Sequence, residues 1–155
     1  MKYATLDATK IAHNLYVGSH PRDERDVERA GFDLHVVVAR ELCPLRTPPL
    51  RKLTVVCAGI NDGVLSLDEA QIVAQAAKTA ADHVRRGSRV LITCWAGLNR
   101  STLTTAVALQ YLHGLPGRLA LRTMRRLRGA TVGSETRVLS NPSFATFLAQ
   151  GGILS

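Results

Sequence analysis

The chain has 155 residues, of which 46% are hydrophobic and 21% charged, and no stretch reaches the roughly 18 uninterrupted apolar residues of a membrane-spanning helix. This composition excludes disordered, collagen-like and disulfide-rich proteins, and the length predicts one domain over residues 1–155. The formal charge of +8, with 16 Arg and only 4 Lys, favours an anionic partner.

Cysteine usage predicts the compartment. The three cysteines, Cys43, Cys57 and Cys94, cannot all pair within one chain, and the opening Met1–Asp7 has no apolar segment of the secretory kind. We therefore expect a cytoplasmic protein whose cysteines are reduced.

The first third of the sequence predicts short strands and one helix. Ile11–Ser19 predicts a strand that ends in a turn, and the charged stretch Pro21–Ala30 predicts a helix ended by Gly31. His35–Ala39 and Leu53–Ala58 are apolar runs too short for helices. We expect both to be strands covered on both faces.

The middle of the chain contains a strand, a loop and a helix in succession. Ser66 and Glu69 form a capping-box pattern that opens a helix to about Arg86. Arg89–Thr93 predicts a strand, and Ser101–His113 predicts an apolar helix after a short loop.

The last third predicts two more helices. One spans about Arg118–Arg128, and the other begins with Asn141 as N-cap and Pro142 at its first position and runs to Leu148. Because strands alternate with helices, the fold class is α/β, a single domain with a central, mainly parallel sheet flanked by helices.

The loop that starts at Cys94 carries the strongest chemical signal. A tight loop leading into a helix N-terminus binds tetrahedral oxyanions through its amides and the helix dipole. The same field stabilises a thiolate at the start of the loop, and Arg100 adds a forked donor. Ser101 can donate to the departing sulfur. The expected phosphate-binding residues are Trp95, Ala96, Gly97, Leu98, Asn99 and Arg100.

The pattern Cys-x5-Arg-Ser after an apolar strand resembles the phosphate-binding loop of the cysteine-dependent protein tyrosine phosphatases, most closely the compact dual-specificity group. Asn14–Ser19 resembles the opening strand of that group, and Asn141–Phe144 resembles its closing helix. The resemblance implies an α/β phosphatase fold, Cys94 as nucleophile, a phosphocysteine intermediate, and neither metal nor cofactor.

The same resemblance implies a general acid about thirty residues before the cysteine. Asp62 lies 32 positions upstream in a loop-forming run, and Asp68 lies 26 positions upstream. Asp68 falls in the first turn of the capped helix, where the helix dipole already explains an acid. We therefore prefer Asp62 as the acid and then the base.

Two residues depart from the usual pattern. Thr93 stands where the family usually has His before the nucleophile, and its hydroxyl can still bond within the loop. Trp95 follows the nucleophile directly, and two positions for it, at the edge of the pocket or beneath it, remain open.

Other features give weaker signals. A helical face with five arginines could bind an acidic phosphopeptide, an inositol lipid headgroup or RNA, although a solvated face is the preferred reading; the five are Arg118, Arg122, Arg125, Arg126 and Arg128. The histidines lack metal-ligand spacing, so no metal site is expected. Either Cys43 or Cys57 could form a disulfide with Cys94 under oxidation.

These observations predict a metal-independent phosphomonoesterase that acts on phosphotyrosine, and on phosphoserine and phosphothreonine as further candidates, in phosphorylated proteins. Two alternatives remain open. The charge of +8 is compatible with an RNA 5′-triphosphatase on the same scaffold, which would act on a nucleic-acid substrate. Thr93 is compatible with a phosphate-binding interaction module of low turnover. The sequence predicts no membrane partner and does not determine the oligomeric state.

Overall fold

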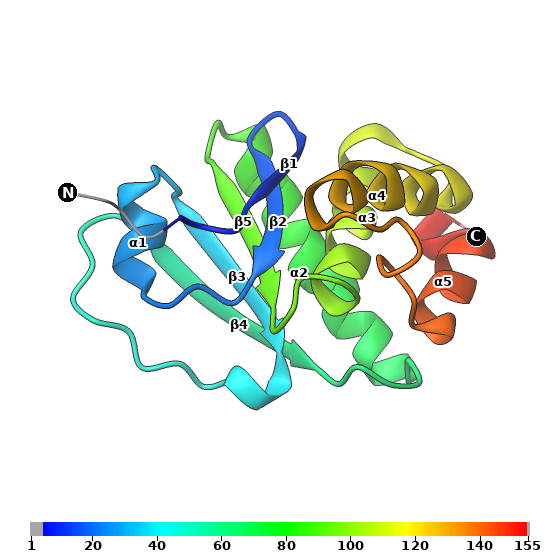
Figure 1. Ribbon diagram of the computed structural model, residues 1–155, viewed down its shortest axis with the longest axis horizontal. Helices are drawn as coiled ribbons and strands as arrows, with labels where there is room; N and C mark the ends of the chain where they lie inside the picture. Colours follow the sequence, from blue (N-terminus) through cyan, green and yellow to red (C-terminus); the bar gives the residue numbers. More distant parts are fainter. Residues whose placement is uncertain (1–4, 155) are drawn as a thin grey trace.

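The computed structural model describes residues 5–154 and contains a five-stranded sheet with the strand order β1-β2-β5-β3-β4 (Figure 1). β1 is antiparallel to β2, and the remaining neighbours are parallel. The predicted α/β fold with a mainly parallel sheet is therefore confirmed. The strands are β1 (Thr9–Ala12), β2 (Leu15–Ser19), β3 (Leu34–Ala39), β4 (Thr54–Ile60) and β5 (Val90–Cys94).

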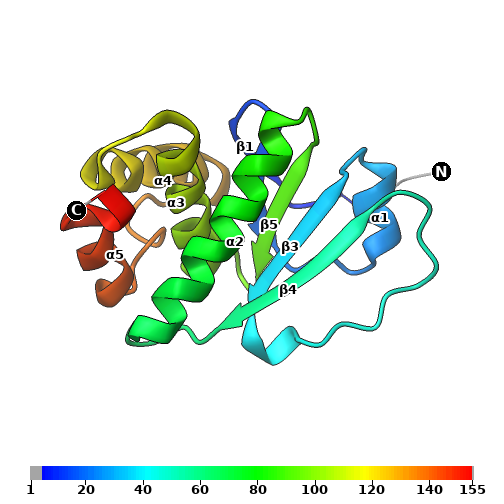
Figure 2. The same ribbon diagram turned by 180° about the vertical axis from the view of Figure 1, so that it is seen from behind.

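Helices cover both faces of the sheet. Figures 1 and 2 show α2 to α5 gathered together and α1 apart from them. This double cover explains why β3 and β5 are buried at every position. The expectation that Leu53–Ala58 is covered on both faces is wrong, because β4 lies at the edge of the sheet and most of its positions are exposed or half-buried. The helices are α1 (Glu24–Arg29), α2 (Leu67–Arg85), α3 (Arg100–His113), α4 (Gly117–Val132) and α5 (Pro142–Ala149), with short 3-10 turns η1 (Arg40–Leu42) and η2 (Gly152–Leu154).

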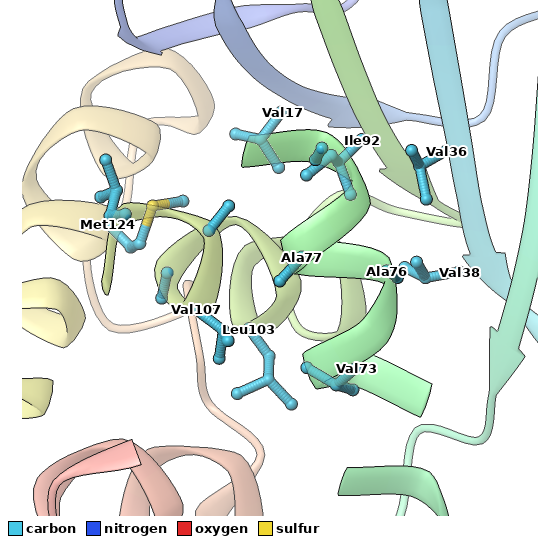
Figure 3. Packing of buried hydrophobic residues seen from close by; sticks show 14 of the residues in the cluster. Val17, Val36, Val38, Val73, Ala76, Ala77, Ile92, Leu103, Val107 and Met124 are labelled. Carbon is cyan, nitrogen blue, oxygen red and sulfur yellow. The ribbon is translucent and has the colours of Figure 1, made fainter. Parts of the chain in front are cut away.

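The main core lies between the sheet and helices α2, α3 and α4 (Figure 3). A smaller cluster, which includes Val27 and Leu91, lies beneath α1 on the other face. Because side chains alternate along a strand, β5 sends Ile92 and Cys94 into the main core and Leu91 toward α1. The central strand therefore delivers Cys94 to the side of the sheet covered by α2 and α3. The main core residues labelled in Figure 3 are Val17, Val36, Val38, Val73, Ala76, Ala77, Ile92, Leu103, Val107 and Met124.

The local end signals of the helices are confirmed. Ser66 and Glu69 form the reciprocal capping box of α2, and the Asn141 side chain accepts two backbone hydrogen bonds at the start of α5. The first strand differs from the prediction. Two strands, β1 and β2, form a hairpin whose turn contains Asn14 at φ 60°, a backbone conformation that Asn tolerates better than most residues.

The arginine-rich face of α4 is smaller than predicted. Arg128 is fully buried, and Arg125 donates to the carbonyl oxygens of Val138 and Leu139. These two side chains hold the fold together, because each satisfies backbone or side-chain acceptors inside the protein. The arginines that remain exposed on this helix are Arg118, Arg122 and Arg126.

The cysteine pairing also differs from the prediction. Cys43 follows η1, Cys57 lies in β4, and the two form a disulfide with 6.0 Å between their Cα atoms. They therefore pair with each other and not with Cys94, which is buried and unpaired. The expectation that all three cysteines are reduced is wrong, because two segments distant in sequence bring Cys43 and Cys57 together.

Candidate active site

The loop between β5 and α3 lies at the carboxyl end of the central strand. Cys94 is the last residue of β5, and Arg100 is the first residue of α3. The positive end of the α3 dipole therefore points into the loop. Open α/β sheets bind ligands at this edge, which agrees with the site predicted from sequence.

The carbonyl oxygens of this loop are bound to donors elsewhere in the protein. Gly97 O accepts from Arg128 Nε at 3.0 Å, and Leu98 O accepts from the amide of Leu139 at 2.8 Å. Within residues 5–154, no amide of residues 95–99 donates to a protein acceptor. These loop amides are therefore available to bind an anion.

Gly97 is the residue that makes this arrangement possible. Its φ of 70° lies in the left-handed region that favours glycine. A Cβ atom at this position would lie 2.6 Å from the carbonyl carbon of Gly18 and would also collide with the Arg128 side chain. Only glycine therefore fits here. Of the other predicted loop residues, Ala96 is exposed, and Leu98 and Asn99 are half-buried.

Cys94 and Ser101 meet inside the loop. The Cys94 Sγ atom lies 3.1 Å from the Ser101 Oγ atom, and Cys94 is only 3% exposed. This contact allows the hydroxyl to donate a hydrogen bond to the sulfur when the sulfur carries negative charge. The structure thus brings together the predicted nucleophile and the predicted donor to the leaving thiolate.

Arg100 is held from one side by Glu41, a residue of η1. Its Nη2 atom donates to Glu41 Oε1 at 2.6 Å, and its Nη1 atom donates to Glu41 Oε2 at 2.5 Å and to the Ile60 carbonyl at 3.1 Å. The Arg100 Nε atom is buried and has no partner. Guanidinium has five N–H donors in a fixed fork, so the edge formed by Nε and Nη2 remains for a second oxyanion.

This pairing changes the titration of both groups. The hydrogen bonds from Arg100 lower the pKa of Glu41 from 4.5 to about 2, and those same bonds raise the pKa of Arg100. Because the folded-state pKa of Glu41 is depressed, the pair stabilises the protein fully above pH 4.5 and is lost as the pH falls through about 2. The guanidinium is thus oriented at neutral pH.

Replacing Glu41 with Gln is expected to raise the KM for an aryl phosphate about tenfold, because the free edge of Arg100 is no longer aimed at the loop. Steady-state kinetics and the inhibition constant of inorganic phosphate measure the effect. Glu135→Gln, at an exposed position, is the matched control and is expected to leave both constants unchanged. Tighter phosphate binding in Glu41→Gln would instead show that Glu41 competes with phosphate for Arg100.

Asp62 lies at the rim of the loop. Its carboxylate accepts from the Asn141 side-chain amide at 2.8 Å and from the Asn99 side-chain amide at 3.4 Å. Asn99 belongs to the loop, and Asn141 begins α5. The two amides therefore place the exposed carboxylate beside the loop. Asp68, the alternative, lies in the first turn of α2, as predicted.

Comparison with solved structures finds proteins of the same fold, although no protein-family model and no curated protein sequence matches the chain. The chain is similar to a mutant form of Tk-PTP, with 26% identity, coverage of 93% of this chain and 95% of that chain, and a TM-score of 0.68. It is similar to human DUSP28 with 20% identity, coverage of 99% and 97%, and a TM-score of 0.74. The chain has the fold of the compact dual-specificity phosphatases.

This phosphatase fold also occurs in a protein named for binding. The human tyrosine phosphatase-like serine/threonine/tyrosine-interacting protein is 13% identical to the chain, with coverage of 94% and 95% and a TM-score of 0.73. Fold likeness at this identity does not separate turnover from binding. The side chains in and around the loop must therefore carry the functional argument.

The two departures from the usual phosphatase pattern have definite positions. Trp95 is 62% exposed and stacks on His20, with 6.1 Å between the ring centroids, so it edges the loop and does not pack beneath it. The Thr93 hydroxyl does not bond within the loop as expected. It lies on the opposite face of the sheet, 2.7 Å from His35 Nε2.

Several residues that shape the site have no sequence signal. Glu41 and Asn141 lie far along the chain from the residues they contact, Arg100 and Asp62. The sequence indicates Asn141 as a helix cap in a segment that resembles a closing helix, not as a partner of Asp62, and Glu41 is an ordinary acid in a loop. Spacing patterns detect neighbours within one element, so contacts between elements are invisible to them.

The described part of the chain offers no alternative centre based on metal. Within residues 5–154, no group of three or more His, Cys, Asp or Glu side chains is placed to hold an ion. The residues at the Cys94 loop offer a thiol, a guanidinium, a carboxyl and backbone amides.

Proposed function

We propose that the chain is a cysteine-dependent phosphomonoesterase that hydrolyses phosphotyrosine in proteins, with phosphoserine and phosphothreonine as further substrates. The observation that carries the proposal is the free Nε and Nη2 edge of Arg100, which is buried at the start of α3 beside the loop that holds Cys94. A buried cationic donor without a partner, beside loop amides that lack protein acceptors, suits a phosphoryl group. The compact dual-specificity phosphatase fold supports the same reaction class.

In the first step, the Cys94 thiolate attacks phosphorus and the bond from phosphorus to the ester oxygen breaks. Asp62 gives its proton to the departing oxygen. The loop amides and Arg100 stabilise the charge on the transferring group, which is the main requirement of phosphoryl transfer. The product of this step is phosphocysteine at Cys94.

In the second step, Asp62 takes a proton from water, and the resulting oxygen nucleophile attacks phosphorus. The bond between sulfur and phosphorus breaks, and phosphate leaves. The Ser101 hydroxyl, 3.1 Å from the sulfur, donates a hydrogen bond to the thiolate that forms. Asp62 thus acts in both halves of the cycle, first as an acid and then as a base.

A substrate panel tests this proposal. Phosphate release is measured from a phosphotyrosine peptide, a phosphothreonine peptide, an inositol phosphate and triphosphate-ended RNA. We expect kcat/KM for the phosphotyrosine peptide to exceed that for the phosphothreonine peptide and the inositol phosphate by about tenfold or more, because an aryl oxygen is a better leaving group than an alkyl oxygen. The fastest release from RNA would select the triphosphatase alternative. Binding of phosphopeptide without any release would select the interaction module.

The substrate class and the cellular location of the protein are also proposed here. We propose phosphorylated proteins as substrates and the cytoplasm as the location. Over residues 5–154, none of the helices has both the length and the apolar character that crossing a membrane requires. Fractionation of cells that express the tagged chain measures the location directly.

A further inference from the structure

Thr93 and Cys94 are consecutive in β5 and point to opposite faces of the sheet. Cys94 belongs to the core beneath α2 and α3, whereas Thr93 lies on the same face as Leu91, toward α1. The Thr93 side chain therefore cannot touch a phosphoryl group at Cys94. Any influence of this side chain on the reaction must pass through the backbone at the base of the loop.

A chain of buried hydrogen bonds holds the Thr93 side chain. Thr93 Oγ1 lies 2.7 Å from His35 Nε2, and His35 Nδ1 lies 2.6 Å from Glu24 Oε2. Thr93 and His35 are fully buried, and Glu24 is 7% exposed. His35 lies in β3, which pairs with β5, and Glu24 is the first residue of α1. These hydrogen bonds thus link α1, through β3, to the residue before Cys94.

Both ring nitrogens of His35 have hydrogen-bond partners in this series of buried contacts. A carboxylate can only accept, so His35 Nδ1 donates to Glu24. His35 Nε2 then accepts from the Thr93 hydroxyl when the ring is neutral and donates to it when the ring is charged. Both buried ring nitrogens are satisfied only while Thr93 and Glu24 keep these positions. A shift of Thr93 would leave a buried polar atom unpaired, which is costly in the protein interior.

We infer that Glu24, His35 and Thr93 form a positioning relay that fixes the base of the Cys94 loop from the opposite face of the sheet. This inference rests on the proposed function. The peptide between Thr93 and Cys94 sets the direction of the first loop residues, and these residues must converge on one phosphoryl group. His35 is accordingly a positioning residue, because it acts on the reaction through Thr93.

Thr93→Val tests the relay, since it removes the hydroxyl and keeps the side-chain shape. We expect kcat for an aryl phosphate to fall about tenfold and KM to change less than about twofold, because a displaced nucleophile weakens the transition state more than ground-state binding. Thr93→Ser keeps the hydroxyl and is expected to restore kcat. Thr105→Val is the matched control, because this buried hydroxyl bonds only to the carbonyl of Ser101 one helical turn earlier.

A double-substitution cycle tests whether the members act together. If His35 acts through Thr93, Thr93→Val combined with His35→Gln loses no more kcat than the worse single variant. Additive losses in kcat would overturn the coupling. A fall in Tm in Thr93→Val with unchanged kcat would show a structural role only and would also overturn the inference.

A second readout does not require turnover. Cys94 is the unpaired thiol, so its alkylation by iodoacetamide at fixed pH reports the state of the sulfur. We expect alkylation to slow about threefold or more in Thr93→Val and to stay unchanged in Thr105→Val. If the unsubstituted protein releases no phosphate, the proposed function fails and alkylation still decides the relay. Equal alkylation rates in Thr93→Val and the unsubstituted protein would overturn the relay.

Discussion

Cys94→Ser is expected to lower kcat for an aryl phosphate by about 10⁴-fold or more, because a hydroxyl forms the required anion far less readily than a thiol. The substitution leaves the loop amides and Arg100 in place, so phosphopeptide binding is expected to persist. Steady-state kinetics measure the loss, and titration with a phosphotyrosine peptide measures the binding. Rapid acid quench of the unsubstituted protein, followed by mass spectrometry, is expected to find the phosphoryl group on Cys94.

Cys57→Ser is the control for this experiment, because Cys57 belongs to the disulfide with Cys43 and takes no part in the proposed reaction. Its turnover is expected to remain far above that of Cys94→Ser. Unchanged turnover in Cys94→Ser would remove Cys94 as the nucleophile. If the unsubstituted protein and Cys94→Ser bind the phosphopeptide equally well and neither releases phosphate, the protein is an interaction module.

Asp62→Asn has the second largest expected effect, a fall in kcat of about 10²- to 10³-fold with a poor leaving group. The amide cannot donate a proton to the departing oxygen, yet it preserves the shape of the side chain held by Asn99 and Asn141. A good leaving group needs little protonation, so its kcat for the first step is expected to change much less. The decline of the rate at high pH, which deprotonation of an acid causes, is expected to disappear.

Asp68→Asn is the matched control for the acid. Asp68 lies in the first turn of α2, where its charge complements the helix dipole. Its replacement is expected to cost about 0.5 kcal/mol of stability and to leave the pH–rate profile unchanged. If Asp62→Asn keeps both its rate and its high-pH decline, and Asp68→Asn loses them, the acid role passes to Asp68.

Local sequence patterns predicted the elements that present the site. The run before Cys94 is apolar and short, the loop contains a glycine, and the segment after it has apolar residues at helical spacing, so strand, loop and helix follow from the residues themselves. Cys94, Arg100 and Ser101 lie within eight consecutive positions, and such short spacing leaves little freedom in their relative placement. The capping box at Ser66 was predictable for the same reason.

Most errors in prediction concern contacts between separate elements of the fold. The pairing of Cys43 with Cys57 depends on how η1 meets β4, and the burial of Arg128 depends on how α4 meets the Cys94 loop. The hairpin turn at Asn14 was missed because a single Asn is a weak turn signal. None of these contacts leaves a periodic trace in the sequence.

The sequence by itself determined the strand-loop-helix unit, the thiol and guanidinium within it, and the expectation of an oxyanion ligand. Only the tertiary structure decided which edge of Arg100 is free, which amides hold Asp62, and that His35 lies behind Thr93. The physical reason is the range of the interactions. Backbone geometry within one loop follows from adjacent residues, whereas these partners meet through the register of the sheet and the packing of helices on it.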